Sequence, residues 1–134
     1  MQNIIPFEYE STRCEARTPD EKYLYVAEIK GCGVKIGITA DPETRMKSHA
    51  RDARVFGYEL GRVWLSIPHH NASANEAALM RHYNSKREYI DTSYEDAVQQ
   101  AAQTPRQRSG QAEYDRHANE VFGIFQSLVL GSTL

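Results

Sequence analysis

Two runs of β-branched and aromatic residues, separated by Gly-Cys-Gly, constrain the fold of this chain more than any other stretch. The first run, KYLYVAEIK, covers residues 22–30, and the second, VKIGIT, covers residues 34–39. Such runs favour β-strands, and glycines in a short connection supply the positive φ angles that a tight turn needs. Residues 22–39 are therefore expected to form a β-hairpin.

A helix is expected directly after this hairpin. Asp41 is a good N-cap, and Pro42 suits the first helical position. The helix should reach about Ala53. After it, YELGRVWLSI (58–67) is expected to form a third strand that ends before Pro68.

The second half of the sequence indicates mostly helix. Asn71 or Ser73 is expected to cap a second helix, and one of residues 91–93 a third, with a short strand or loop between them. Residues 104–111 resemble a linker in composition, and the apolar positions of residues 112–134 recur with helical spacing. That spacing is set by Val121, Ile124, Phe125 and Leu128.

The expected fold class is α+β, with a small three-stranded mixed or antiparallel sheet flanked by helices. The expected units are an N-terminal arm (1–21) that can hold one short strand near residues 4–9, a domain (22–103), the linker (104–111) and a C-terminal amphipathic helix (112–134). That last helix is expected either to pack on the domain or to form a homodimer.

Composition excludes several classes of protein. No run approaches the roughly 20 apolar residues of a membrane span, the N-terminus lacks a secretory pattern, and two cysteines are too few for a disulfide framework. A cytoplasmic protein without a membrane partner is expected. The formal net charge of −2 does not indicate a polyanion partner, so a DNA-binding function depends on a local basic patch. That patch consists of Arg45, Lys47, Arg51 and Arg54, against only Asp52.

Two neighbouring elements place cations where they could form a site. Alternation along the second strand puts Lys35 and Gly37 on the face opposite Ile36. A lysine there is typical of a solvated edge strand, but a glycine inside a strand often marks the close approach of a ligand. Arg45 and His49 share one face of the helix, where they are either an ordinary helix flank or a phosphate-binding pair.

Glu76 falls on the stripe of the second helix that should be buried, four residues after Ala72 and four before Met80. Because burying an unpaired carboxylate is costly, Glu76 is expected either to form a structural salt bridge or to bind a metal. A single glutamate is enough for Mg²⁺, which keeps most of its waters. With a phenol from Tyr25 or Tyr23, Lys35, Arg45 and His49, these groups could hydrolyse a phosphodiester.

Five segments, in this order, resemble the motifs of the GIY-YIG nuclease superfamily and, within it, the T5orf172-like branch common in phage and bacterial genomes. They are YLY (23–25), KIG (35–37), RMKSH (45–49), ANEAALMRHYN (74–84) and SKREYIDTSYEDAVQQ (85–100). The resemblance implies a cytoplasmic, phage-type endonuclease that cleaves DNA with Mg²⁺ or Mn²⁺. The catalytic set it implies is Tyr25, Lys35, Arg45 and His49, with Tyr23 in place of the motif glycine and Glu76 as metal ligand.

In this resemblance, Arg45 would hold the scissile phosphate, His49 would assist proton transfer or phosphate binding, and Tyr25 would act as base. Substrate contacts would come from Lys47, Arg51 and Gly37. The missing glycine of the first motif and the lysine at position 35 leave an alternative open, an inactive module of the same fold that binds nucleic acid or protein. A Glu76–Arg45 ion pair without room for a metal would favour that alternative.

Overall fold

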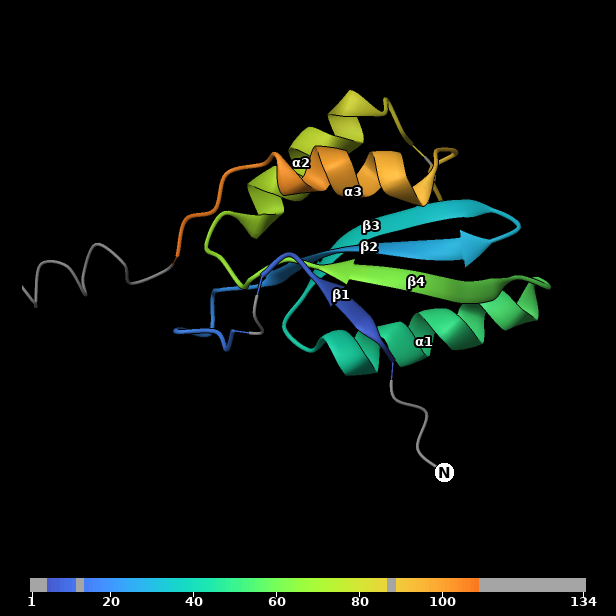
Figure 1. Ribbon diagram of the computed structural model, residues 1–134, viewed down its shortest axis with the longest axis horizontal. Helices are drawn as coiled ribbons and strands as arrows, with labels where there is room; N and C mark the ends of the chain where they lie inside the picture. Colours follow the sequence, from blue (N-terminus) through green and yellow to red (C-terminus); the bar gives the residue numbers. More distant parts are fainter. Residues whose placement is uncertain (1–4, 12–13, 87–88, 109–134) are drawn as a thin grey trace, which may run out of the picture.

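A four-stranded mixed sheet lies at the centre of the fold, with helices on both of its faces (Figure 1). The strands are β1 (Phe7–Tyr9), β2 (Tyr23–Lys30), β3 (Gly33–Thr39) and β4 (Glu59–Leu65), in the order β1-β4-β2-β3. β2 runs antiparallel to β3 and β4, whereas β1 runs parallel to β4. The computed structural model describes residues 5–11, 14–86 and 89–108.

The expected hairpin is present and places β3 at the edge of the sheet. Its turn contains Gly31 at φ +90° and Gly33 at φ +153°, backbone conformations that favour glycine. In its register Tyr25 lies opposite Gly37, and Ala27 lies opposite Lys35. The face of β3 that bears Lys35 is therefore also the face of β2 that bears Tyr25.

Three helices pack on this sheet, α1 (Pro42–Val55), α2 (Ala72–His82) and α3 (Tyr94–Ala102). α1 covers one face, and α2 and α3 cover the other (Figure 1). Asp41 caps α1 as expected, accepting a hydrogen bond from the Thr44 backbone N–H, and Ser93 caps α3 in the same way through Asp96. Asn71 stands at the N-cap of α2 but makes no capping bond, because its side chain binds residues 105 and 107 instead.

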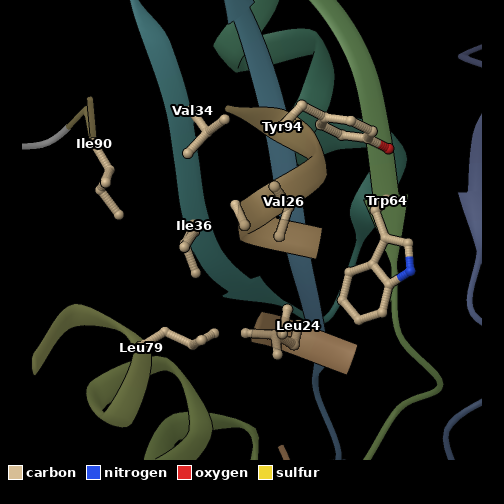
Figure 2. Close-up of a cluster of buried hydrophobic side chains, with 10 residues drawn as sticks. Leu24, Val26, Val34, Ile36, Trp64, Leu79, Ile90 and Tyr94 are labelled. Carbon is tan, nitrogen blue, oxygen red and sulfur yellow. The ribbon is translucent and has the colours of Figure 1, made fainter. Parts of the chain in front are cut away.

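Separate hydrophobic clusters fill the two sides of the sheet. Figure 2 shows the larger one, where Leu24, Val26 and Trp64 of the sheet meet Leu79 and Tyr94 of α2 and α3. On the other side, Met46 of α1 is fully buried against Tyr23, Tyr25 and Val63. Because both faces are covered, a polar site with access to solvent has to lie at an edge of the sheet.

The expectation of a three-stranded sheet is wrong by one strand. The short strand considered within the N-terminal arm is β1, and it joins the sheet by pairing with β4, with Phe7 opposite Val63 and Tyr9 opposite Leu65. In the described part of the segment before α3, the strand pairing is an isolated bridge between Ile90 and Val34. Every helix in the described ranges is too short or too polar to span a bilayer.

Residues 104–108, expected to be linker, are bound to the domain. Arg106 donates two hydrogen bonds to Glu10, at 3.0 and 3.1 Å, and Arg108 donates two to Glu21, at 2.9 and 3.0 Å. Glu21 is buried, so its guanidinium partner offsets a desolvated charge. The basic character of this segment is therefore used within the fold. The predicted C-terminal helix (112–134) and its packing or dimerisation lie outside the described residues.

Candidate active site

A polar pocket of about 310 Å³ lies at the outer edge of β3. Four elements line it, and its residues are Tyr25, Lys35, Ile36, Gly37, Ile38, Arg45, Ser48, His49, Asp52 and Glu76. Because β3 is an edge strand, side chains from α1 on one face and from α2 on the other can reach the same space. The predicted residues Tyr25, Lys35, Arg45, His49 and Glu76 all line this pocket, as does Gly37.

Tyr25 and His49 form a hydrogen-bonded pair in the wall of the pocket. The Tyr25 hydroxyl lies 2.7 Å from His49 Nε2, and the two ring centroids are 5.6 Å apart. Both side chains are buried, with 3% and 7% of their surfaces exposed. An imidazole nitrogen that faces a phenol can accept its proton or donate one, depending on the tautomer.

Gly37 makes room for this pair. A Cβ atom built at Gly37 would come within 2.6 Å of Tyr25 Cζ, a separation that real side chains do not show. The sequence indicated that this glycine leaves open space for a ligand beside Lys35. That space is instead taken by the cross-strand Tyr25 ring, so Gly37 acts by positioning the phenol against His49.

The pocket contains two cationic side chains from different elements. Lys35 comes from β3 and also approaches Tyr89, with its Nζ atom 5.7 Å from the ring centroid. Arg45 comes from the first half of α1 and is exposed. Its guanidinium forms no hydrogen bond or ion pair with any other described residue, so its donors are accessible from the pocket.

Glu76 of α2 closes the opposite side of the pocket and is half-buried. Burial raises the pKa of its carboxyl group, and the charge of Lys35 partly counteracts that shift. Within the described part of the chain, this carboxylate makes no hydrogen bond or ion pair. The structural salt bridge considered from the sequence, including one to Arg45, is therefore not formed among these residues.

The carboxylates of the pocket are suited to a hard divalent cation. Glu76 and Asp52 both line it, and carboxylate oxygens are the ligands that Mg²⁺ prefers. No cluster of three or more His, Cys, Asp or Glu side chains suited to a metal occurs in the described ranges. Mg²⁺ does not require such a cluster, since it is commonly held by one or two carboxylates, waters and substrate phosphates.

The raised pKa of Glu76 predicts a stability effect. A carboxyl group with a folded-state pKa above its unfolded value destabilises the fold at any pH where it is ionised in both states. Glu76→Gln should therefore raise the melting temperature of the metal-free protein at pH 7. The gain should shrink as the pH falls toward 4.5, the ordinary pKa of a glutamate, and should vanish below it. Thermal unfolding in a chelator at several pH values measures this, and a gain that does not depend on pH would contradict it.

Three of the predicted residues lie outside the pocket. The Tyr23 hydroxyl donates to the Cys14 carbonyl at 2.8 Å, and its ring belongs to the cluster under α1. Lys47 and Arg51 are exposed on α1 and do not line the pocket. The fold thus separates Tyr23 from Tyr25, which the sequence left as alternatives for the phenol.

Ser48 and Asp52 were not singled out from the sequence as site residues, although both line the pocket. Helical spacing could have identified them, since Ser48 follows Arg45 by three residues and Asp52 follows His49 by three. The sequence indicated Asp52 only as the acidic residue within the basic patch of α1. It gives the pocket a second carboxylate, so the site combines two cations and two carboxylates.

The fold and site define a small α+β domain with a polar pocket at the open edge of its sheet. Comparisons of the chain with known protein families, with curated proteins and with solved structures find no match. The function therefore has to be argued from the pocket itself.

Proposed function

We propose that this chain is a metal-dependent endonuclease that hydrolyses DNA phosphodiester bonds. One observation supports it above all others. Tyr25, Lys35, Arg45, His49 and Glu76 come from four elements and line one open pocket. The same five positions fall in segments that resemble the ordered motifs of the GIY-YIG nucleases, with Lys35 in the place of a motif tyrosine, and this resemblance predicts DNA as substrate.

Lys35 and Arg45 would hold the scissile phosphate. Arginine can bind two phosphate oxygens at once through its planar fork, and lysine adds a compact positive charge. Lys35 belongs to β3 and Arg45 to α1, and both line the pocket. This arrangement orients the phosphate and stabilises the negative charge that develops on its oxygens in the transition state.

Tyr25 and His49 would move the proton of the attacking water. As the water attacks phosphorus, the Tyr25 oxygen accepts its proton and passes the phenol proton to His49 Nε2 over the 2.7 Å hydrogen bond. This requires the tautomer with its proton on Nδ1, leaving Nε2 as acceptor. The step is balanced, since the water loses one proton and the imidazole gains one.

Glu76 would be the main metal ligand, with Asp52 as the second carboxylate near the phosphate. A bound Mg²⁺ or Mn²⁺ would supply Lewis-acid stabilisation of the phosphate. The absence of a described partner for Glu76 and its raised pKa both support this role. A divalent cation restores the favourable electrostatics that burial of the carboxylate removes.

The direct test is cleavage of supercoiled plasmid and of labelled oligonucleotides by the full chain. Cleavage is expected with Mg²⁺ or Mn²⁺ and should be absent in a chelator. Single-stranded, duplex and branched substrates should all be included, because the target structure is not fixed by the pocket. Intact DNA in every substrate and both metals would overturn the proposal.

One observation favours a second candidate, a nucleic-acid-binding module without catalysis. Lys35 stands where the resemblance calls for a tyrosine, and its charge acts on Glu76. In such a module Lys35 would simply offset the half-buried carboxylate. This candidate predicts DNA binding of equal affinity in Mg²⁺ and in chelator, without cleavage.

A further inference from the structure

An exposed apolar tip ends α1. Val55 and Phe56 are adjacent there, with 79% and 68% of their surfaces exposed. Tyr9, on β1, is the other large apolar side chain exposed in the described ranges. A phenylalanine that exposes most of its surface gains little from burial within the fold, which makes this tip a candidate contact surface.

The backbone holds Phe56 in a fixed position. The Tyr58 N–H donates to the Ala53 carbonyl at 2.8 Å, and the Gly57 N–H donates to the Arg54 carbonyl at 3.1 Å. These two bonds are those of a Schellman motif, in which a left-handed residue closes the helix. Gly57 is that residue, at φ +80°. The aromatic ring is therefore presented by a closed helix end.

Phe56 continues the face of α1 that lines the pocket. It follows Arg45, His49 and Asp52 by eleven, seven and four residues, intervals close to whole helical turns. At 1.5 Å per residue, its position is roughly 10 Å beyond His49 along the helix axis.

The exposed basic side chains outside the pocket lie on another side of α1. At 3.6 residues per turn, Lys47, Arg51 and Arg54 fall roughly 140° to 180° around the helix axis from Phe56. Phe56 therefore shares its side of the helix with Arg45, the cation of α1 that lines the pocket, and not with this second basic row.

We propose that Phe56 is a stacking platform for an unpaired nucleobase a few nucleotides away from the phosphate held in the pocket. This proposal rests on the proposed function. The offset of about 10 Å corresponds to roughly three base steps of 3.4 Å. Stacking on an aromatic ring is tolerant of sequence, because every base has a π-face.

The first test measures the affinity of the full chain for a fluorescein-labelled oligonucleotide of about 12 thymidines, by anisotropy in chelator. Phe56→Ala is expected to raise the Kd roughly 5- to 100-fold. Phe56→Leu, which keeps an apolar side chain but removes the ring, should lose most of that affinity. Tyr9→Ala is the matched control, and its Kd should stay within about twofold of wild type.

A second test detects stacking directly. Phe56→Trp should retain binding, and its tryptophan emission should be quenched by the oligonucleotide, whereas the exposed indole of Tyr9→Trp should not respond. Trp64 is buried and provides a constant background. A duplex that carries one 2-aminopurine base is the second oligonucleotide. If the fluorescence of 2-aminopurine rises with wild type but not with Phe56→Ala, the base has left the duplex. A Phe56-dependent response in either oligonucleotide supports the platform.

Equal affinities of wild type, Phe56→Ala and Phe56→Leu for both oligonucleotides would overturn the platform. If wild type still cleaves DNA in that case, the proposed function stands and only the platform fails. No binding of any oligonucleotide by wild type, together with intact DNA in the cleavage assay with both metals, would overturn both. A change in oligomeric state on Phe56→Ala, with unchanged DNA affinity, would mean that a second copy of the chain covers the tip.

Discussion

Glu76→Gln is expected to lower the rate of metal-dependent DNA cleavage by roughly 100- to 1,000-fold, the scale found when one charge-stabilising group is removed from an active site. Glutamine preserves the size of the side chain, but its neutral amide is a weaker ligand for a divalent cation. Because Asp52 remains in the pocket, the metal concentration that gives half of the maximal rate should also rise. Initial rates over a titration of Mg²⁺ measure both effects.

Glu59→Gln is the matched control for this prediction. Glu59 is an exposed residue of β4 outside the pocket, so the variant changes net charge equally without touching the site. Its cleavage rate should remain within about twofold of wild type. A wild-type rate and metal dependence for Glu76→Gln would remove Glu76 from catalysis.

Glu76→Gln is expected to raise stability but to lower activity. These two results together distinguish a catalytic role from a loss of the fold. The variant should be more stable than wild type without metal, because a costly carboxylate is gone, and nearly inactive with metal. If the variant were inactive because it is destabilised, its melting temperature would instead be lower than that of wild type. A functional group that costs stability is a common feature of active sites.

Local sequence signals were sufficient for the hairpin and for the start of α1. Asp41 and Pro42 determine where α1 begins, and Gly31 and Gly33 allow the tight turn between β2 and β3. The spacing of Arg45 and His49 along a helix was equally local. These parts of the fold and of the site depend on interactions between residues close in sequence, so they can be predicted from a local sequence pattern.

Contacts between residues far apart in the sequence could not be predicted from such local signals. Arg106 was assigned to a linker by composition, but it binds Glu10, 96 positions away. A short strand near residues 4–9 was expected and is present as β1, but its parallel pairing with β4 joins segments more than 50 positions apart. Nothing in the local sequence specifies either partner.

The ambiguity between Tyr23 and Tyr25 has the same cause. Alternation puts both phenols on the same face of β2, as the structure has them. Their register with β3 separates them, since Tyr25 lies opposite Gly37 and Tyr23 lies opposite Thr39. Only the residue opposite the glycine has room to extend its ring across β3 to His49.

Tyr25→Phe is expected to lower the cleavage rate by roughly 100- to 10,000-fold, the range for loss of a general acid–base group. The variant removes one oxygen and keeps the ring that packs over Gly37. DNA affinity and metal dependence should be unchanged, because Lys35, Arg45 and Glu76 are intact. Loss of the hydrogen bond to His49 should cost about 1 kcal/mol of unfolding free energy. Single-turnover cleavage and denaturant unfolding measure the two quantities.

Tyr23→Phe provides a control that differs from Tyr25→Phe almost only in the partner of the lost hydroxyl. Both phenols are on the same face of β2, with 7% and 3% of their surfaces exposed, and the hydroxyl of each is hydrogen-bonded at a normal distance, 2.8 Å for Tyr23 and 2.7 Å for Tyr25. Tyr23→Phe should therefore lose a similar amount of stability, while its cleavage rate stays near that of wild type, because its partner is the Cys14 carbonyl and not a proton acceptor in the pocket. Equal losses of activity in the two variants would show that the phenols contribute through packing, and the proton relay through Tyr25 and His49 would then be wrong.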